Sequence, residues 1–165
     1  MGVTYKANFN ANSLRKKTGF GDHRKFKATV EKALAPTVTK MIKRIRRGQG
    51  IDGPLKRLSA LYADYKQAVG RRPIPDRTLT GALLQAIHEK YQNRGCSVEG
   101  TVFFTDSTHP LAPKRAGGGR YSGNNKRTTI HAVARAMQDK QHFFGFRKHE
   151  RDSFVSLLRK YLRVK

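Results

Sequence analysis

The chain has 165 residues, about the length of one ordinary domain, which excludes a large multidomain enzyme. It carries 35 Lys and Arg residues against 11 Asp and Glu, so its formal net charge at pH 7 is +24. This excess favours an acidic partner, such as a nucleic acid, an anionic membrane surface or an acidic protein, and the lack of a long apolar stretch argues against a membrane span or a signal peptide.

The N-terminal part of the sequence predicts an arm followed by a long helix. Residues 1–21 are rich in Asn, Gly and Lys without a sustained apolar period, which predicts an extended or mobile arm. From Asp22, a suitable N-cap, apolar residues recur every three or four positions until Gly48, the pattern of an amphipathic helix. Pro36 is expected to kink or split this helix near Ala35.

The middle of the chain predicts a turn and two further helices. The glycines of Gly48–Gly53 match a dinucleotide-binding spacing, but a helix precedes them and Pro54 follows, so we expect a turn. Apolar spacing predicts a short helix over 59–69, and the prolines of 71–75 indicate a connector. A third helix is expected from about Thr78 or Thr80 to Gln92.

The C-terminal part predicts strands, a loop and two helices. Alternating apolar residues over 97–105 indicate a strand. Residues 108–126 combine prolines, glycines and basic residues, which predicts a long mobile loop. A short helix over 130–137, a buried strand over 143–146 and a final helix over 150–165 follow.

These elements predict the fold class. We expect an α+β fold in which a small antiparallel sheet is packed by the long N-terminal and C-terminal helices. The expected organisation is the arm at 1–21 and a single domain at 22–165, with the basic, Gly-rich loop at 108–126.

Basic residues concentrate in three regions of the sequence. The cluster between Lys40 and Arg47 suits the C-terminal end of a helix dipole as well as it suits a phosphate contact. The arm and the loop supply the candidate contacts to DNA or to an acidic partner, which are Arg15, Lys16, Lys17, Lys114, Arg115, Arg120, Lys126 and Arg127.

Residues with catalytic or metal-binding chemistry form no recognisable constellation in the sequence. His88 is followed by Glu89 but lacks the second histidine of a zinc-protease motif. The scattered acidic residues do not supply the clustered carboxylates of a two-metal nuclease. Cys96, the one cysteine, allows no internal disulfide and indicates a buried structural thiol and a reducing place of synthesis. We therefore expect no enzyme activity, no metal and no cofactor.

Three short motifs occur in order along the chain: DGPLKRLS at 52–59, LTGAL at 79–83 and HFFGF at 142–146. They resemble the D-G-x-x-W-x-P-L-S turn, the L-x-x-T-G-x-L helix entry and the R-P-F-L-G strand of the phage virion-morphogenesis or tail-completion family. Leu55 and Arg57 stand where this family has Trp and Pro, and the third motif has His-Phe in place of Arg-Pro.

The resemblance implies a structural virion protein that is synthesised in the host cytoplasm and acts in tail completion or head–tail joining at the neck. It implies a homo-oligomer, a hexameric ring through which DNA passes. The implied partners are portal, adaptor, tail-tube or tail-terminator proteins and channel DNA, with no membrane.

Two alternatives stay open at this point. Phe143, Phe144 and Phe146 place aromatic rings on both faces of their expected strand, so they are either a candidate subunit interface or part of an intramolecular core. The charge alone supports a different function, that of a sequence-nonspecific nucleic-acid-binding protein of ribosomal or chromatin type, although no known binding module is recognisable.

Overall fold

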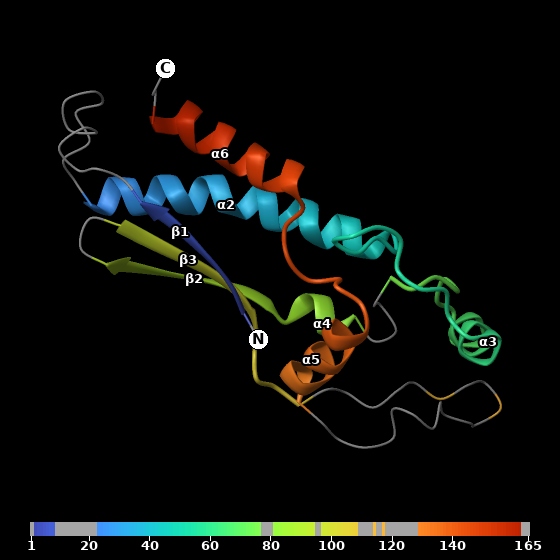
Figure 1. Ribbon diagram of the computed structural model, residues 1–165. Helices are drawn as coiled ribbons and strands as arrows, with labels where there is room; N and C mark the ends of the chain where they lie inside the picture. Colours follow the sequence, from blue (N-terminus) through green and yellow to red (C-terminus); the bar gives the residue numbers. More distant parts are fainter. Residues whose placement is uncertain are drawn as a thin grey trace. The chain divides into compact units, whose positions relative to one another are not determined.

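The computed structural model confirms the α+β fold (Figure 1). It describes residues 2–8, 23–76, 81–94, 97–108, 114, 117 and 129–162. The elements in chain order are β1 (Gly2–Asn8), α2 (His23–Arg46), α3 (Ala60–Ala68), α4 (Ala82–Gln85), β2 (Ile87–Arg94), β3 (Ser97–Phe104), α5 (Ile130–Lys140) and α6 (Lys148–Leu162). None of the helices in these ranges is long and apolar enough to span a bilayer.

The chain, for which the sequence predicted one domain after the arm, divides into two compact units. We call the first the sheet unit, and its described residues lie within 2–41, 88–103 and 146–165. We call the second the turn unit, and its described residues lie within 42–87 and 104–145.

The strands form a three-stranded sheet in the order β1-β3-β2. β1 runs antiparallel to β3, with Gly2 opposite Phe103 and Asn8 opposite Ser97, and β2 and β3 run in opposite directions (Figure 1). β1 lies within the predicted arm, where the sequence indicated no regular element, and positions 9–22 lie outside the described residues.

α2 packs on the sheet through the apolar face that its sequence period predicted. Phe26, Val30 and Leu34 are among its buried residues, and a Cβ atom added to Gly100 of β3 would lie 3.1 Å from Leu34 Cδ2. The absence of a side chain at Gly100 therefore lets the helix approach the strand closely. The helix continues through Pro36 and is not split there, in contrast to one of the two expected outcomes.

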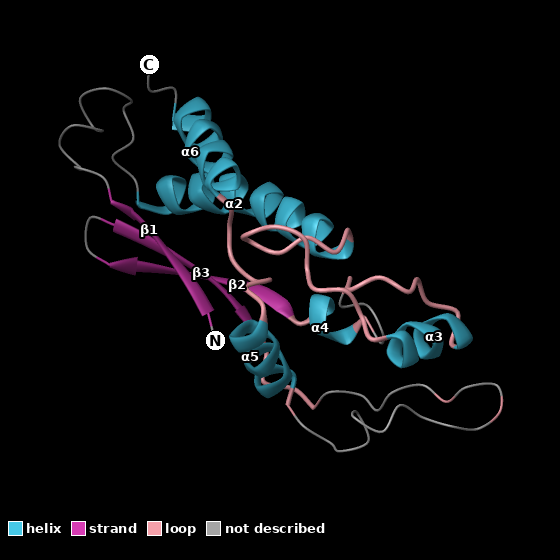
Figure 2. Cartoon of the chain, turned by 45° about the vertical axis from the view of Figure 1, so that its right-hand side comes forward, coloured by secondary structure: helices cyan, strands magenta, loops and turns pink. Residues whose placement is uncertain are grey.

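α6 packs beside α2 in the sheet unit. Lys40 Nζ donates a hydrogen bond to Ser153 Oγ at 2.8 Å, and Lys32 Nζ lies 4.9 Å from the centroid of the Tyr161 ring. Because the lower-numbered lysine meets the higher-numbered partner, the two helices run antiparallel (Figures 1 and 2). At the start of α6 the buried Glu150 accepts a hydrogen bond from the N–H of Arg147 at 2.8 Å.

The turn unit has an aromatic and aliphatic core. The ring of Phe104 lies 4.5 Å from that of Phe144 and 6.2 Å from that of Phe143, measured between centroids. Ser59, the predicted start of this helix, is the N-cap of α3, and its hydroxyl accepts a hydrogen bond from the N–H of Tyr62. The predicted helices over 22–47, 59–69, 130–137 and 150–165 and the predicted strand over 97–105 are confirmed as α2, α3, α5, α6 and β3.

The third predicted helix is wrong over most of its length. Among its described residues, 82–85 are helical as α4, and residues 87–94 form β2. Ile87, Glu89 and Tyr91 are less exposed than the residues between them, so a period of two coexists with the helical spacing. Pairing with β3 selects the strand, because tertiary contacts override a local preference. Thr78 and Thr80, the expected starts of this helix, lie outside the described residues.

The predicted strand over 143–146 is also wrong, because this segment is irregular. The N–H groups of Phe143 and Phe144 both donate to Gln138 Oε1, at 3.1 and 3.0 Å, in place of a neighbouring strand. Gly145 then adopts a φ of 135°, which ends any extended run.

Candidate functional site

Arg44, on the buried side of α2, organises the most elaborate polar arrangement of the turn unit. It is 7% exposed. Its guanidinium donates hydrogen bonds to the carbonyl oxygens of Gln49 at 3.0 Å, Phe143 at 3.5 Å and Gly145 at 2.6 Å. A guanidinium holds its five N–H donors in one rigid plane, so this one side chain fixes two separate loops. We call Arg44, residues 48–55 and residues 141–145 the Arg44 site.

The first loop of the Arg44 site is a tight turn, as the sequence predicted. The N–H of Gly50 donates to the carbonyl of Gly53 at 2.7 Å, and the N–H of Leu55 donates to that of Gly48 at 2.7 Å. A Cβ atom added to Gly50 would lie 2.8 Å from the carbonyl oxygen of His142. The glycine at position 50 therefore permits close backbone packing.

The second loop docks directly onto this turn. The N–H of Ile51 donates to the carbonyl oxygen of His142 at 2.6 Å, and Asp52 Oδ2 lies 3.0 Å from His142 Nδ1. The side chains of Asp52 and His142 are 73% and 65% exposed, so the pair forms the outer edge of the site. The structure thus brings together the first and third motifs of the sequence.

The aromatic residues of the third motif are buried within the chain. Phe143 and Phe144 are 0% and 2% exposed, and Phe146 in the sheet unit is 7% exposed. Their side chains leave almost no surface for a neighbouring subunit. The structure therefore favours the intramolecular core over the candidate subunit interface.

The predicted basic contacts fall mostly on residues that the structure does not describe. Lys114 is described and exposed. Positions outside the described ranges are Arg15, Lys16, Lys17, Arg115, Arg120, Lys126 and Arg127. The base of the predicted loop is closed by a β-bridge between Thr108 and Thr129 and by a 2.7 Å hydrogen bond from the N–H of Ile130 to the carbonyl of Ser107.

Two buried cations, Arg44 and Lys66, were not expected from the sequence. Arg44 lies in a cluster with exposed residues such as Arg46 and Arg47, although it follows Met41 at the spacing of the buried face. The ammonium of Lys66 lies 2.6 Å from Asp76 Oδ1 and 2.7 Å from the carbonyl of Ile74. No sequence pattern pairs Lys66 with Asp76, because their contact depends on the path of the connector between them.

Other titratable groups serve structure. Burial, followed by a hydrogen bond from its hydroxyl to Glu89, raises the pKa of Tyr91 above its usual range. Within the described ranges no three His, Cys, Asp or Glu side chains come together in a group that can hold a metal ion.

No protein-family model matches the chain, and neither a curated protein nor a solved structure matches it.

Proposed function

We propose that this chain is a structural virion protein of a tailed phage, which completes the tail or joins head and tail at the neck. In this role it forms a homo-oligomeric, hexameric ring through which DNA passes. The observation that carries the proposal is the meeting of two motifs far apart in sequence: Asp52 lies 3.0 Å from His142, and the preceding Ile51 donates a 2.6 Å hydrogen bond to the same residue.

The Arg44 site gives these motifs a common structural role. The N–H of Ile51, which directly precedes the D-G turn, donates to His142 of the HFFGF segment, and Arg44 donates to Gln49 before the turn and to Gly145 in the segment. Short motifs that resemble a family by chance have no reason to pack together in space. Their contact therefore supports an interpretation in which they are parts of one structural feature.

A ring of identical subunits requires that each copy presents one surface to a different surface of the next copy. Rigid, exposed loops suit such a contact, because little conformational entropy is lost on assembly. The outer edge of the Arg44 site meets this requirement, since Asp52 and His142 are exposed on loops that Arg44 holds in place.

Deletion of the gene from the phage genome that encodes it tests the proposal. We expect DNA-filled heads and separate tails to accumulate, and a plasmid copy of the gene to restore joined particles. Direct imaging of purified virions should locate a tagged copy at the neck. Infectious particles that form without the protein, or purified virions that lack it, would contradict the proposal.

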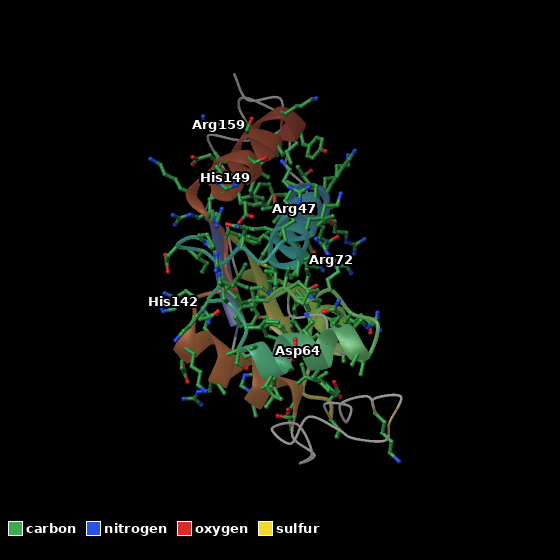
Figure 3. The ribbon with its side chains drawn as sticks, turned by 90° about the vertical axis from the view of Figure 1, so that its right-hand side faces the viewer. Arg47, Asp64, Arg72, His142, His149 and Arg159 are labelled. Atoms are coloured by element: carbon green, nitrogen blue, oxygen red, sulfur yellow. The ribbon has the colours of Figure 1, made fainter. Side chains whose placement is uncertain are left out.

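A pair of charge reversals tests the contribution of the Arg44 site. Asp52→Lys changes its outer edge, whereas Asp64→Lys changes an exposed acid on α3, outside the motifs (Figure 3). We expect Asp52→Lys to reduce the yield of joined particles and Asp64→Lys to leave it close to wild type. Equal yields from the two variants would show that the Arg44 site does not take part in the assembly contact.

A further inference from the structure

α2 and α6 of the sheet unit are neighbours joined by two side-chain contacts. Lys32 and Lys40 on α2 are separated by the same number of residues as Tyr161 and Ser153 on α6, and each lysine contacts its partner across the pair. The two contacts are therefore about 12 Å apart along both helices. The helices therefore stay side by side over this length (Figure 1).

The exposed charged residues of α2 and α6 in the sheet unit are almost all basic. We call these exposed cations together the basic face, and they are Arg24, Lys25, Lys32, Lys40, Lys148, Arg151, Arg159 and Lys160. Among the described residues of α2 and α6, Asp152 is the exposed acid. Glu150 is buried, and Glu31 is half-buried with Lys27 Nζ at 3.7 Å.

We infer that the basic face binds the phosphate backbone of double-stranded DNA without reading its base sequence. Lysine and arginine contacts to phosphates supply affinity that does not depend on sequence, through the release of condensed counterions. The basic face supplies such cations from two helices whose relative position is fixed by the contacts of Lys32 and Lys40.

The composition of the basic face favours DNA over an acidic protein. Protein interfaces are anchored by buried apolar and aromatic side chains at their centre. On the described part of the two helices the large exposed apolar side chain is Val155, which is 43% exposed. Single-stranded nucleic acids are bound through aromatic stacking, and here the ring of Tyr161 has Lys32 over it.

The dimensions of the basic face also suit a duplex. Lys25 and Lys40 are about 22 Å apart along α2, and Lys148 and Arg159 are about 16 Å apart along α6. A duplex presents one charge about every 1.7 Å of its axis and repeats about every 34 Å, so these cations can follow its backbone over a large part of one turn. This binding does not depend on the virion role, because every DNA duplex presents the same phosphate backbone to these cations.

Two matched triple variants of the full chain test the inference. The face variant carries Lys25→Gln, Arg159→Gln and Lys160→Gln, and the control variant carries Lys56→Gln, Arg71→Gln and Arg72→Gln, which removes the same charge from exposed positions of the turn unit. Fluorescence anisotropy with a random-sequence duplex measures the affinity over a range of salt concentrations. Circular dichroism checks that each variant is folded.

The wild-type chain should bind the duplex with a steep salt dependence. The face variant should lose on the order of a hundredfold in affinity at about 0.15 M salt, and its salt slope should fall by about 3. The control variant should lose less than about threefold, as expected for charges that make no phosphate contact. Acetylation of lysines with and without the duplex needs no variant, and it should show protection of Lys25 and Lys160 but not of Lys56.

Several results would overturn the inference. They are an absence of duplex binding by the wild-type chain at about 0.15 M salt, equal losses in the two variants, and equal protection of the three lysines. A face variant that keeps its affinity for the duplex but loses affinity for a polyglutamate peptide would assign the basic face to an acidic protein. None of these measurements depends on virion assembly, so failure here leaves the proposed function to its own test.

Discussion

The guanidinium of Arg44 donates a 2.6 Å hydrogen bond to the carbonyl oxygen of Gly145, which fastens the end of α2 to a segment 101 residues further along the chain. The same side chain also bonds the carbonyl of Gln49, in the turn that follows the helix. The basic cluster at the end of α2 therefore contains one buried arginine that organises loops, together with exposed residues such as Arg46 and Arg47.

Replacement of Arg44 by methionine should destabilise the protein strongly. Arg44→Met removes charged donors from buried carbonyl groups, which we expect to cost about 2–4 kcal/mol of the free energy of unfolding. Urea denaturation measures this loss. Arg46→Met, on the exposed side of the same helix, serves as the control and should change the free energy by less than about 0.5 kcal/mol. Equal stabilities of the two variants would mean that the three carbonyls do not depend on Arg44.

Gly145→Ala should destabilise the protein for two separable reasons. Gly145 has a φ of 135°, where an L residue is strained, and an added Cβ would lie 2.8 Å from Ile51 Cδ1. We expect the variant to lose about 2–4 kcal/mol of the free energy of unfolding in urea denaturation.

Gly70→Ala separates strain from crowding. Gly70 also has a positive φ, of 71°, but nothing lies within 4 Å of an added Cβ, so this control should lose about 1–2 kcal/mol. Combining Gly145→Ala with Ile51→Ala should recover the part that arises from the contact with Ile51. If the double variant loses as much as the two single variants added together, crowding against Ile51 is not the cause.

The helices of this protein were largely predictable, because each carries a local apolar period. α2, α3, α5 and α6 all lie where the sequence indicated them. The apolar period gave a wrong prediction at β2. The spacing of Leu83, Ile87 and Tyr91 fits a helix, but pairing with β3 makes residues 87–94 a strand. The sequence also predicted a strand at Phe143 and Phe144, where the backbone is irregular. The burial of these two rings was one of the two alternatives that the sequence left open.

The candidate site was predictable only in its parts. The turn after α2 could be derived from the glycines and Pro54, and the HFFGF segment stood out by its aromatic residues. Their contact could not be derived, because the hydrogen bond from Ile51 to His142 joins residues that share no local pattern. The role of Arg44 could not be predicted either, because an arginine at the basic end of a helix usually faces solvent.

The buried ion pair of Lys66 and Asp76 should be costly to break from one side. Both side chains are almost fully buried, so Asp76→Asn leaves the ammonium of Lys66 without its counter-charge. We expect a loss of about 3–5 kcal/mol of the free energy of unfolding. Urea denaturation of the double variant Lys66→Met/Asp76→Leu should recover most of this loss, because well-packed apolar residues can replace a buried pair.

A half-buried ion pair in α2, far more exposed than Lys66 and Asp76, gives the matching control. Lys27 and Glu31 are 3.7 Å apart, and their side chains are 40% and 42% exposed. Glu31→Gln should therefore change the free energy of unfolding by less than about 0.5 kcal/mol. A loss as large as that of Asp76→Asn would show that burial does not set the difference between the two pairs.

Tyr91 should make the protein less stable in alkaline solution. Burial, and then the hydrogen bond that its hydroxyl donates to Glu89, raises the pKa of Tyr91 in the folded protein above its unfolded value of about 10. The stabilisation is fully present below about pH 10 and is lost as the pH rises further, because unfolding then releases the proton. Urea midpoints at about pH 9 and about pH 11 measure the loss.

Tyr91→Phe, which has no proton to release, should lose less stability over this interval than the wild type. Glu89→Gln should fall between the two, since it removes the acceptor charge and leaves the burial. Identical pH dependences of Tyr91→Phe and the wild type would show that Tyr91 does not couple folding to pH.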